Sequence, residues 1–318
     1  MASALAAAYR DFARAAQGRS PLYEKLADGV AADEGLLARI AELPPAKRQP
    51  NLLFAAMKYL FGVAQDWPDF RARALDHWDA VRAVMAAHRT QTNEPARCAT
   101  LLPVLARLKQ PLALLEVGAS AGLCLLPDYY AYAYGDHVIA PTIATAEPPL
   151  FRCAAGPGTP LPTRNVEVAW RAGLDLNPLD ACDPDTVRWL KALVWPGEGA
   201  REELLGQALA IAAAARPRLV KGDLRRDLAA LAAEAPPDAS LVIFHSAVLN
   251  YVDDPAERMA FAAAVRATGA QWIAQEDPDI FSESNRRSWP AGIFFRLSLN
   301  GETLGRAESH GASMEWLS

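Results

Sequence analysis

Glu116, Gly118, Ser120 and Gly122 are the residues whose types and spacing most clearly indicate chemistry. They follow an apolar run with the character of a buried strand and precede a segment with a helical pattern. Glycines at such a turn let the backbone approach a nucleotide-like ligand where a Cβ would collide with it. Residues 118–122 also spell Gly-x-Ser-x-Gly, the nucleophile elbow of serine hydrolases. The turn therefore predicts either a ligand-binding loop or a nucleophile.

Further polar residues stand where the other predicted strands end. Asp175 ends the second strand, Asp223 follows the third, and the fourth runs into His245 and Ser246. Ligands of open parallel sheets bind beyond the carboxyl ends of the strands. A carboxylate at position 175 can accept bonds from both ribose hydroxyls, which suits S-adenosylmethionine or NAD. Each residue could instead be structural, so their order on successive strands carries more weight than any one of them.

The elements that must position these residues begin at Pro111, where short apolar runs alternate with helical patterns. This alternation is typical of a parallel sheet covered by helices. Asn300-Gly301 predicts a terminal antiparallel hairpin of strands 293–299 and 302–306, and one more short strand fits 312–317. The other predicted strands are 112–117, 168–176, 218–221, 240–244 and 271–275, and the predicted helices are 121–132, 184–194, 202–215, 227–234 and 255–268.

The sequence before residue 110 has a helical period and little strand-like character. Five or six helices are predicted, including a buried one around 52–61, one over 70–88 and one over 95–108. We therefore predict a helical domain at 1–110 and an α/β domain at 111–318, with an insertion around 124–165 where proline and glycine are dense. Asn93 and Glu94 lie close enough to the sheet to border a ligand cleft, although helix capping explains both equally well.

Composition narrows the class of protein without naming it. The 318 residues carry a net charge of −5, which argues against a dedicated DNA-binding or anionic-membrane-binding protein. No apolar run approaches the roughly 18 residues of a membrane helix. The cysteines and histidines are scattered, which indicates reduced thiols and no metal site. We expect a cytoplasmic protein with a small-molecule partner.

Serine hydrolases and dehydrogenases are two enzyme classes that use a glycine turn after a strand. A hydrolase would use Ser120 as nucleophile, with Asp223 and His245 following in the expected chain order. Against it, everything before Leu112 has a helical pattern, no His-Gly-Gly-Gly-like stretch supplies an oxyanion hole, and Asp223 comes early for a triad acid. A dehydrogenase is disfavoured because the Gly-x-Gly-x-x-Gly spacing is absent.

The sheet domain resembles the Rossmann-like methyltransferases that use S-adenosylmethionine, because residues 114–122 are similar to their first motif and a terminal hairpin follows five parallel strands. Several longer sequence segments indicate one particular family. Together they resemble the bacterial family known as domain of unknown function 2332, in which Cys124 stands where we expect asparagine. The segments are residues 50–56, 91–98, 115–123, 170–178, 188–196 and 244–249.

The resemblance implies a mostly parallel Rossmann-like sheet, S-adenosylmethionine as cofactor, and methyl transfer to an acceptor that the sequence does not name. His245 is the candidate general base. The alternative is a non-catalytic module that keeps a nucleoside pocket or only the scaffold. The implied cofactor residues are Glu116 for the amino group, Gly118, Ala119, Ser120 and Gly122 around the methionine end, Asp175 for the ribose and Asp223 for the adenine; the substrate-side candidates are Asn93, Glu94 and Ser246.

Overall fold

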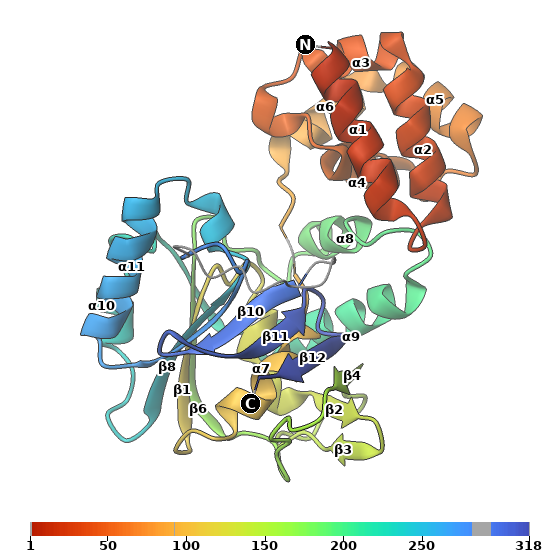
Figure 1. Cartoon of the computed structure of the whole chain (residues 1–318). Coiled ribbons are helices and arrows are strands. Elements are labelled where there is room, and N and C mark those ends of the chain that lie inside the picture. The colour runs from red at the N-terminus through yellow and green to blue at the C-terminus, as the bar shows by residue number, and fades with distance from the viewer. Residues whose placement is uncertain (1, 92, 282–293, 318) are drawn as a thin grey trace. The chain divides into compact units, whose positions relative to one another are not determined.

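The computed structural model describes residues 2–91, 93–281 and 294–317 (Figure 1). The chain forms two compact units, and each is discontinuous in sequence. The helical unit contains residues 1–92 and 183–206, and the sheet unit contains residues 93–182 and 207–318. This division differs from a single boundary near residue 110, because the helix after Asn93 belongs with the sheet and a segment from the middle of the chain belongs with the helices.

Capping side chains set several boundaries in the helical unit. Ser20 and Asp33 accept hydrogen bonds from the backbone at the starts of α2 and α3, and Asp66 does so at α5. The predicted helix over 70–88 is broken at His77, which ends α5 and begins α6. The helices of this unit are α1 (Ala2–Ala16), α2 (Pro21–Ala32), α3 (Glu34–Ala41), α4 (Pro50–Phe61), α5 (Trp67–Asp76), α6 (Trp78–Ala87) and α8 (Pro184–Ala192), with a short 3-10 turn η1 (Pro45–Lys47).

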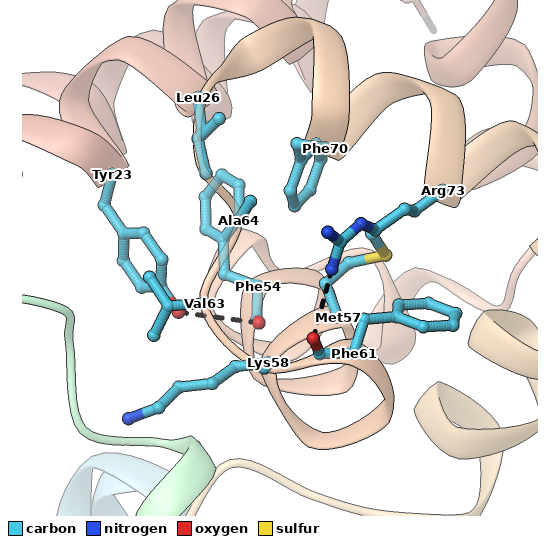
Figure 2. A pocket seen from close by; sticks show the side chains of 11 residues that line it. Tyr23, Leu26, Phe54, Met57, Lys58, Phe61, Val63, Ala64, Phe70 and Arg73 are labelled. Atoms are coloured by element: carbon cyan, nitrogen blue, oxygen red, sulfur yellow. Dashed lines mark hydrogen bonds between the residues drawn. The ribbon is translucent and has the colours of Figure 1, made fainter.

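Phe54 on α4 is the centre of the helical core. Its ring lies 4.8 Å from that of Tyr23 and 5.2 Å from that of Phe12, measured between centroids. Trp195, from the distant 183–206 segment, packs 4.9 Å from Phe12. A pocket beside Phe54, shown in Figure 2, is lined mainly by apolar side chains and has a volume of about 10 Å³. That volume admits no more than a single water molecule.

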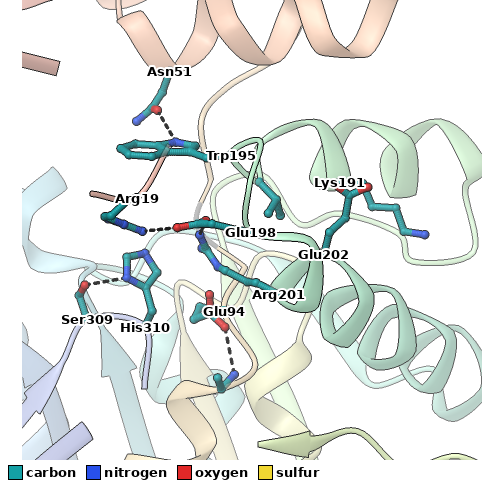
Figure 3. Close-up of polar contacts among 12 residues, drawn as sticks. Arg19, Asn51, Glu94, Lys191, Trp195, Glu198, Arg201, Glu202, Ser309 and His310 are labelled. Atoms are coloured by element: carbon teal, nitrogen blue, oxygen red, sulfur yellow. Dashed lines mark hydrogen bonds and ion pairs between the residues drawn. The ribbon is translucent and has the colours of Figure 1, made fainter. Parts of the chain in front are cut away.

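Polar contacts also hold the 183–206 segment within the helical unit. The ammonium of Lys58 donates to the carbonyls of Lys191 and Val194 and to the carboxylate of Glu202. Figure 3 shows a second group, in which Arg19 pairs with Glu198 at 2.8 Å. Both groups join residues more than a hundred positions apart, so the segment is an integral part of this unit.

Nine strands of the described residues form one sheet in the order β5-β12-β11-β10-β9-β8-β1-β6-β7. From β9 to β7 all neighbours are parallel, and β1 is central. Chain connections leave β1 toward β6 on one side and continue at β8 on the other, so the sheet has a switch point between β1 and β8. The parallel strands are β1 (Leu112–Val117), β6 (Val168–Asp175), β7 (Arg218–Lys221), β8 (Ser240–Ser246) and β9 (Gln271–Glu276).

The rest of the sheet is mainly antiparallel. The predicted hairpin is confirmed, because β10 (Phe294–Leu299) and β11 (Glu302–Glu308) pair around Asn300 and Gly301, both with positive φ. Residue 293, which the prediction included, lies outside the described residues. β12 (Ser313–Trp316) pairs with β11, and β5 (Ala154–Ala155) adds to β12 in parallel.

Side chains alternate between the two faces of the sheet. On one face Leu115 and Val117 of β1 pack with α10 (Leu228–Ala232) and α11 (Pro255–Ala267) in a shared apolar core. On the other face lies α7 (Arg97–Leu105), and its Thr100 bonds to Gln275 of β9. α9 (Gly199–Ala215) precedes β7 in the chain. Glu116 alternates with Leu115 and Val117, so it points to the α7 face.

The predicted helix over 121–132 is wrong. The chain instead forms two 3-10 turns, η2 (Leu123–Leu125) and η3 (Pro127–Tyr129), and enters a small sheet of order β3-β2-β4. Gly122 has φ of +70°, and the hydroxyls of Tyr130 and Tyr132 bond to nearby backbone carbonyls rather than following a helical repeat. The small sheet consists of β2 (Ala131–Tyr134), β3 (His137–Ile139) and β4 (Leu150–Arg152).

Candidate ligand site at the carboxyl ends of the strands

The glycine-rich turn after β1 is closed by its own hydrogen bonds. The N–H of Gly118 donates to the carbonyl of Leu174 at 2.7 Å, and the N–H of Gly122 donates to Ala119 at 2.6 Å. Gly118 has φ of +75°, and a Cβ on it would lie 2.3 Å from a methyl of Val248. Packing against this chain's own side chain therefore explains Gly118.

Asn93 holds the same turn from outside. Its Nδ2 donates to Oγ of Ser120 at 2.9 Å, and its Oδ1 accepts the N–H of Ala121 at 3.0 Å. Ser120 has φ of +48°, a conformation that costs energy for a residue with a Cβ. Asn93, predicted as a substrate-side residue, thus lies at the turn, where both ends of its amide bind the protein.

Asp175 joins β6 to the turn. Its Oδ2 accepts the N–H of Ser120 and its Oδ1 accepts the N–H of Asn177, both at 2.7 Å. An ionised carboxylate has about four acceptor positions, so these two bonds leave capacity for further donors. The residue is partly exposed. It is therefore held in a fixed orientation and can still accept bonds from a ligand.

Glu116 is buried at the end of the central strand without a partner for Oε2. Burial raises the pKa of its carboxyl well above the usual range, as do the nearby Cys124 and Asp175, while the charge of Arg97 opposes that shift. An unpaired carboxyl costs free energy where it is desolvated. A ligand that offers it a hydrogen-bond donor or a positive charge would recover that cost.

Ser246 and Gln275 extend the unpartnered group across the switch point. They are register neighbours on β8 and β9, and Ser246 ends the strand beside β1. Oγ of Ser246 and Nε2 of Gln275 are buried without partners, while the other end of the Gln275 amide contacts Thr100 at 3.1 Å. Glu116, Ser246, Gln275 and the adjacent Arg97 are called the switch-point cluster below.

Arg97 supplies the positive charge of the switch-point cluster. It is buried at the start of α7, and its Nε donates to the carbonyl of Ser309 at 2.8 Å and its Nη1 to that of Ser246 at 3.3 Å. In the described part of the chain both bonds go to carbonyls, so its charge is not cancelled by an ion pair. Arg97 is not among the residues predicted for the site, because a single charge in an apolar helical segment does not indicate a role.

Asp223 is committed to another partner. Its Oδ1 accepts from Nε of Arg225 at 2.8 Å and its Oδ2 from Nη2 at 2.5 Å, in a two-pronged ion pair. The bond from Arg225 lowers the pKa of Asp223 to about 2 against the opposing effect of burial. Arg225 also pairs with Glu257 on α11. The geometry gives Asp223 a structural role in the loop after β7, rather than a free carboxylate for an adenine amino group.

His245 does not face the switch-point cluster, because it lies on the α10/α11 side of β8 against Phe261. It is fully buried, with Nδ1 2.6 Å from Oε1 of Glu276 and Nε2 accepting the indole N–H of Trp272 at 2.9 Å. An indole can only donate, so Nε2 carries no hydrogen and Nδ1 donates to Glu276. With both ring nitrogens bonded inside the core, His245 is not placed to act as a general base.

Glu276 is a residue that sequence reasoning missed. Its Oε1 also accepts the N–H of Val248 at 2.8 Å, and Val248 is the residue whose methyl covers Gly118. The His245–Glu276 pair therefore fixes the loop after β8 against the glycine turn. A buried acid at the end of the fifth parallel strand was the available signal.

The three residues of the hydrolase hypothesis are not brought together. Ser120 binds Asn93, Asp223 binds Arg225, and His245 binds Glu276 and Trp272. His245 therefore has no ring nitrogen left to activate a serine. The strand ends carry a cluster of polar side chains, not a catalytic triad.

Among the described residues, no group of three or more His, Cys, Asp or Glu is arranged to hold a metal ion. No helix among them is long and apolar enough to cross a membrane. Glu94, the other substrate-side candidate next to Asn93, is buried, and its carboxylate accepts the N–H of Ala96 at 3.3 Å.

The fold and the site together define a mixed α/β protein with an open, mostly parallel sheet and a buried polar cluster at its switch point. A family model matches residues 6–316, so the chain belongs to the family described as an uncharacterised protein conserved in bacteria, domain of unknown function 2332. No curated protein and no solved structure gives a significant match.

Proposed function

We propose that the sheet unit binds S-adenosylmethionine at the switch point between β1 and β8 and is a methyltransferase. The observation that carries the proposal is the switch-point cluster, in which adjacent strand ends hold buried polar atoms without partners. Buried polar groups in proteins are nearly always bonded. Three such atoms on one face of a sheet, where open sheets bind ligands, support a polar ligand there.

The charges of the cluster suit the amino-acid end of this ligand. The ammonium group would neutralise Glu116, whose pKa is raised by burial, and the carboxylate would face Arg97, whose charge has no ion pair in the described residues. Ser246 and Gln275 would complete the hydrogen bonds. A zwitterion thus matches both signs of charge, which neither a simple anion nor a simple cation would do.

Asp175 would hold the ribose. Its carboxylate is oriented by the N–H groups of Ser120 and Asn177 and retains acceptor capacity for two hydroxyls. The glycine turn would contribute shape rather than hydrogen bonds, since the N–H groups of Gly118, Ser120 and Ala121 are already bonded. When bound, the sulfonium supplies an electrophilic methyl group, and the protein's task is to align an acceptor with it and exclude water.

Calorimetry with S-adenosylhomocysteine tests the proposal directly. The wild-type chain should bind, and Glu116→Gln should weaken binding about tenfold or more, because a charge-assisted bond to the ammonium is lost. Glu167→Gln, an exposed glutamate just before β6, is the matched control and should leave the affinity unchanged. Absence of any heat or thermal shift at about 1 mM ligand would reject the proposal.

A non-catalytic module with the same ligand is the second candidate. The observation that favours it is the loss of His245 as a base, because both of its nitrogens are bonded in the core. The two candidates differ in turnover. Binding of S-adenosylhomocysteine without transfer of labelled methyl groups to any acceptor, in the purified chain, would favour the module.

A further inference from the structure

The turn between β11 and β12 contains a second histidine–carboxylate pair. Glu308 is fixed by the N–H groups of His310 at 2.8 Å and Ala312 at 3.3 Å, and its Oε1 lies 3.1 Å from Nδ1 of His310. Ser309 contacts both side chains at 3.0 Å, and Figure 3 shows its hydroxyl directed at the His310 ring. Although burial opposes it, these bonds lower the pKa of Glu308 to about 2, so the carboxylate is ionised at neutral pH.

This turn packs directly on the start of α7. Gly311 has φ of +83°, and a Cβ on it would lie 2.1 Å from the carbonyl oxygen of Ala96. Arg97 donates to the carbonyl of Ser309, and the same guanidinium reaches the carbonyl of Ser246. His310 is therefore anchored, through its two neighbours in the chain, to the helix end that carries the positive charge of the switch-point cluster.

We propose that His310 is the proton acceptor for the molecule that receives the methyl group, with Glu308 as its positioning residue; this rests on the proposed function. With Nδ1–H donating to Glu308, the lone pair of Nε2 is available, and this nitrogen has no hydrogen-bond partner among the described residues. The His310 side chain is 24% exposed, so part of its ring is accessible. His245, fully buried with both nitrogens bonded, has neither property.

A base at this position defines the acceptor class as protic nucleophiles: alcohols, phenols or amines. The acceptor's lone pair forms the new bond to the methyl carbon, and the carbon–sulfur bond breaks with its electron pair passing to the sulfonium sulfur. The proton of the acceptor moves to Nε2 of His310, and Glu308 stabilises the imidazolium. An acceptor that is already anionic, such as a carboxylate, would need no such base.

Within the described residues of the sheet unit, two segments bring charged groups to this turn. Glu308 lies at the start of the turn itself, while Arg97 begins α7 and donates to the carbonyl of Ser309, and Glu94 lies just before the same helix. If His310 is the proton acceptor, the rate of methyl transfer should fall in acid. The pH at which the rate falls should then change when Glu308 is neutralised. A purely structural histidine would leave no such limb in the pH profile of methyl transfer.

The first experiment does not require an acceptor. Diethyl pyrocarbonate, which reacts with unprotonated imidazole nitrogen, should modify His310 but not His245 in the native chain, as mapped by mass spectrometry. Modification should leave the affinity for S-adenosylhomocysteine unchanged. A native chain whose His310 resists the reagent would overturn the proposal, because a base must present its nitrogen to solvent or substrate.

The second experiment follows labelled methyl groups from S-adenosylmethionine to a panel of alcohols, phenols, amines and carboxylates. His310→Asn keeps a donor to Glu308 but removes the basic nitrogen, so kcat for protic acceptors should fall about 10²–10⁴-fold. His137→Asn, at an exposed position on β3, is the matched control. Glu308→Gln should shift the acidic limb of the pH profile.

The outcomes separate this inference from the proposed function. If the wild-type chain does not bind S-adenosylhomocysteine, both the proposed function and the role of His310 are rejected. A chain that binds it but methylates only carboxylates, or whose His310→Asn variant keeps the wild-type kcat, overturns the role of His310 alone. Unchanged calorimetric affinity in His310→Asn, together with lost transfer, supports it.

Discussion

Asn93 and Ser120 are joined by a hydrogen bond of 2.9 Å from the amide Nδ2 to the hydroxyl Oγ, while the other end of the same amide accepts the N–H of Ala121. A residue that precedes α7 thus clamps the turn that follows β1. Ser120 is held in a left-handed conformation that its own side chain disfavours. The turn therefore depends on a contact from outside its own strand–turn unit.

Asn93→Ala should destabilise the chain by about 1–3 kcal/mol, because it leaves the N–H of Ala121 and the hydroxyl of Ser120 without this partner. Urea unfolding followed by circular dichroism measures the change. Ser120→Ala should cost less, since the N–H of Ala121 keeps its bond to Asn93. The double variant should cost less than the sum of the two single changes; strict additivity would show that the two residues are not coupled.

Glu116→Gln should stabilise the apo chain at high pH while it weakens ligand binding. The folded-state pKa of Glu116 is raised, so wild-type stability is complete below the unfolded-state pKa and falls as pH rises toward the folded-state value. The variant should exceed the wild type by about 1–3 kcal/mol near pH 8, and the difference should shrink toward about pH 4. A difference in unfolding free energy between the variant and the wild type that stays constant with pH would contradict the raised pKa.

Asp175→Asn should lose both stability and affinity for S-adenosylhomocysteine. The amide has one oxygen, so one of the two N–H groups from Ser120 and Asn177 would face an NH₂ group. We expect a cost of about 1–3 kcal/mol in unfolding free energy. Asp180→Asn, an exposed change five residues further along the chain, is the control. Unaltered affinity in a folded Asp175→Asn variant would remove Asp175 from the ribose site.

Trp272→Phe should lower stability without abolishing ligand binding. The change removes the N–H that Nε2 of His245 accepts inside the core, leaving that nitrogen unpartnered at a cost of about 1–3 kcal/mol. Thermal unfolding and calorimetry on the same sample separate the two effects. A large loss of affinity at unchanged stability would instead place the His245 network in the ligand site.

Glu308→Gln should make the chain less stable at neutral pH, with the deficit shrinking in acid. The folded-state pKa of Glu308 is lowered to about 2. The wild-type carboxylate therefore contributes stability above its unfolded-state pKa, and this contribution is lost as the pH falls toward the folded-state pKa. Each 1 kcal/mol corresponds to roughly 2–4 °C in Tm for a unit of this size. A constant difference in Tm across the acidic range would show that the charge of Glu308 is not involved.

Much of the sheet could be predicted from the sequence, because the parallel strands contain short apolar runs flanked by polar and turn residues. β1 and β7 were predicted at their observed bounds, and the Asn300-Gly301 hairpin followed from its turn chemistry. The helix after the glycine turn could not be excluded locally, since the apolar spacing of residues 121–132 suits a helix. Contacts of its tyrosine hydroxyls with the backbone override that preference.

The candidate site was predicted less completely. The order of Glu116, the glycine turn and Asp175 predicts that they lie together at the carboxyl ends of neighbouring strands, and the structure places them there. The partners of Asp223 and His245 could not be read from the chain, because Arg225 is one of many charged surface residues and Glu276 lies thirty-one positions from His245. Arg97 was missed because long-range contacts, rather than local spacing, give it its neighbours.

The discontinuity of the two units sets an order of events during synthesis. Lys58 reaches its carbonyl and carboxylate partners, and Phe12 its contact with Trp195, only after residues 183–206 exist. The ribosome must therefore complete β1, the insertion and β6 before the helices made first can acquire their full core. Nascent chains stopped before residue 183 should expose the aromatic surface around Phe54, which makes that interval the one in which a chaperone is most needed.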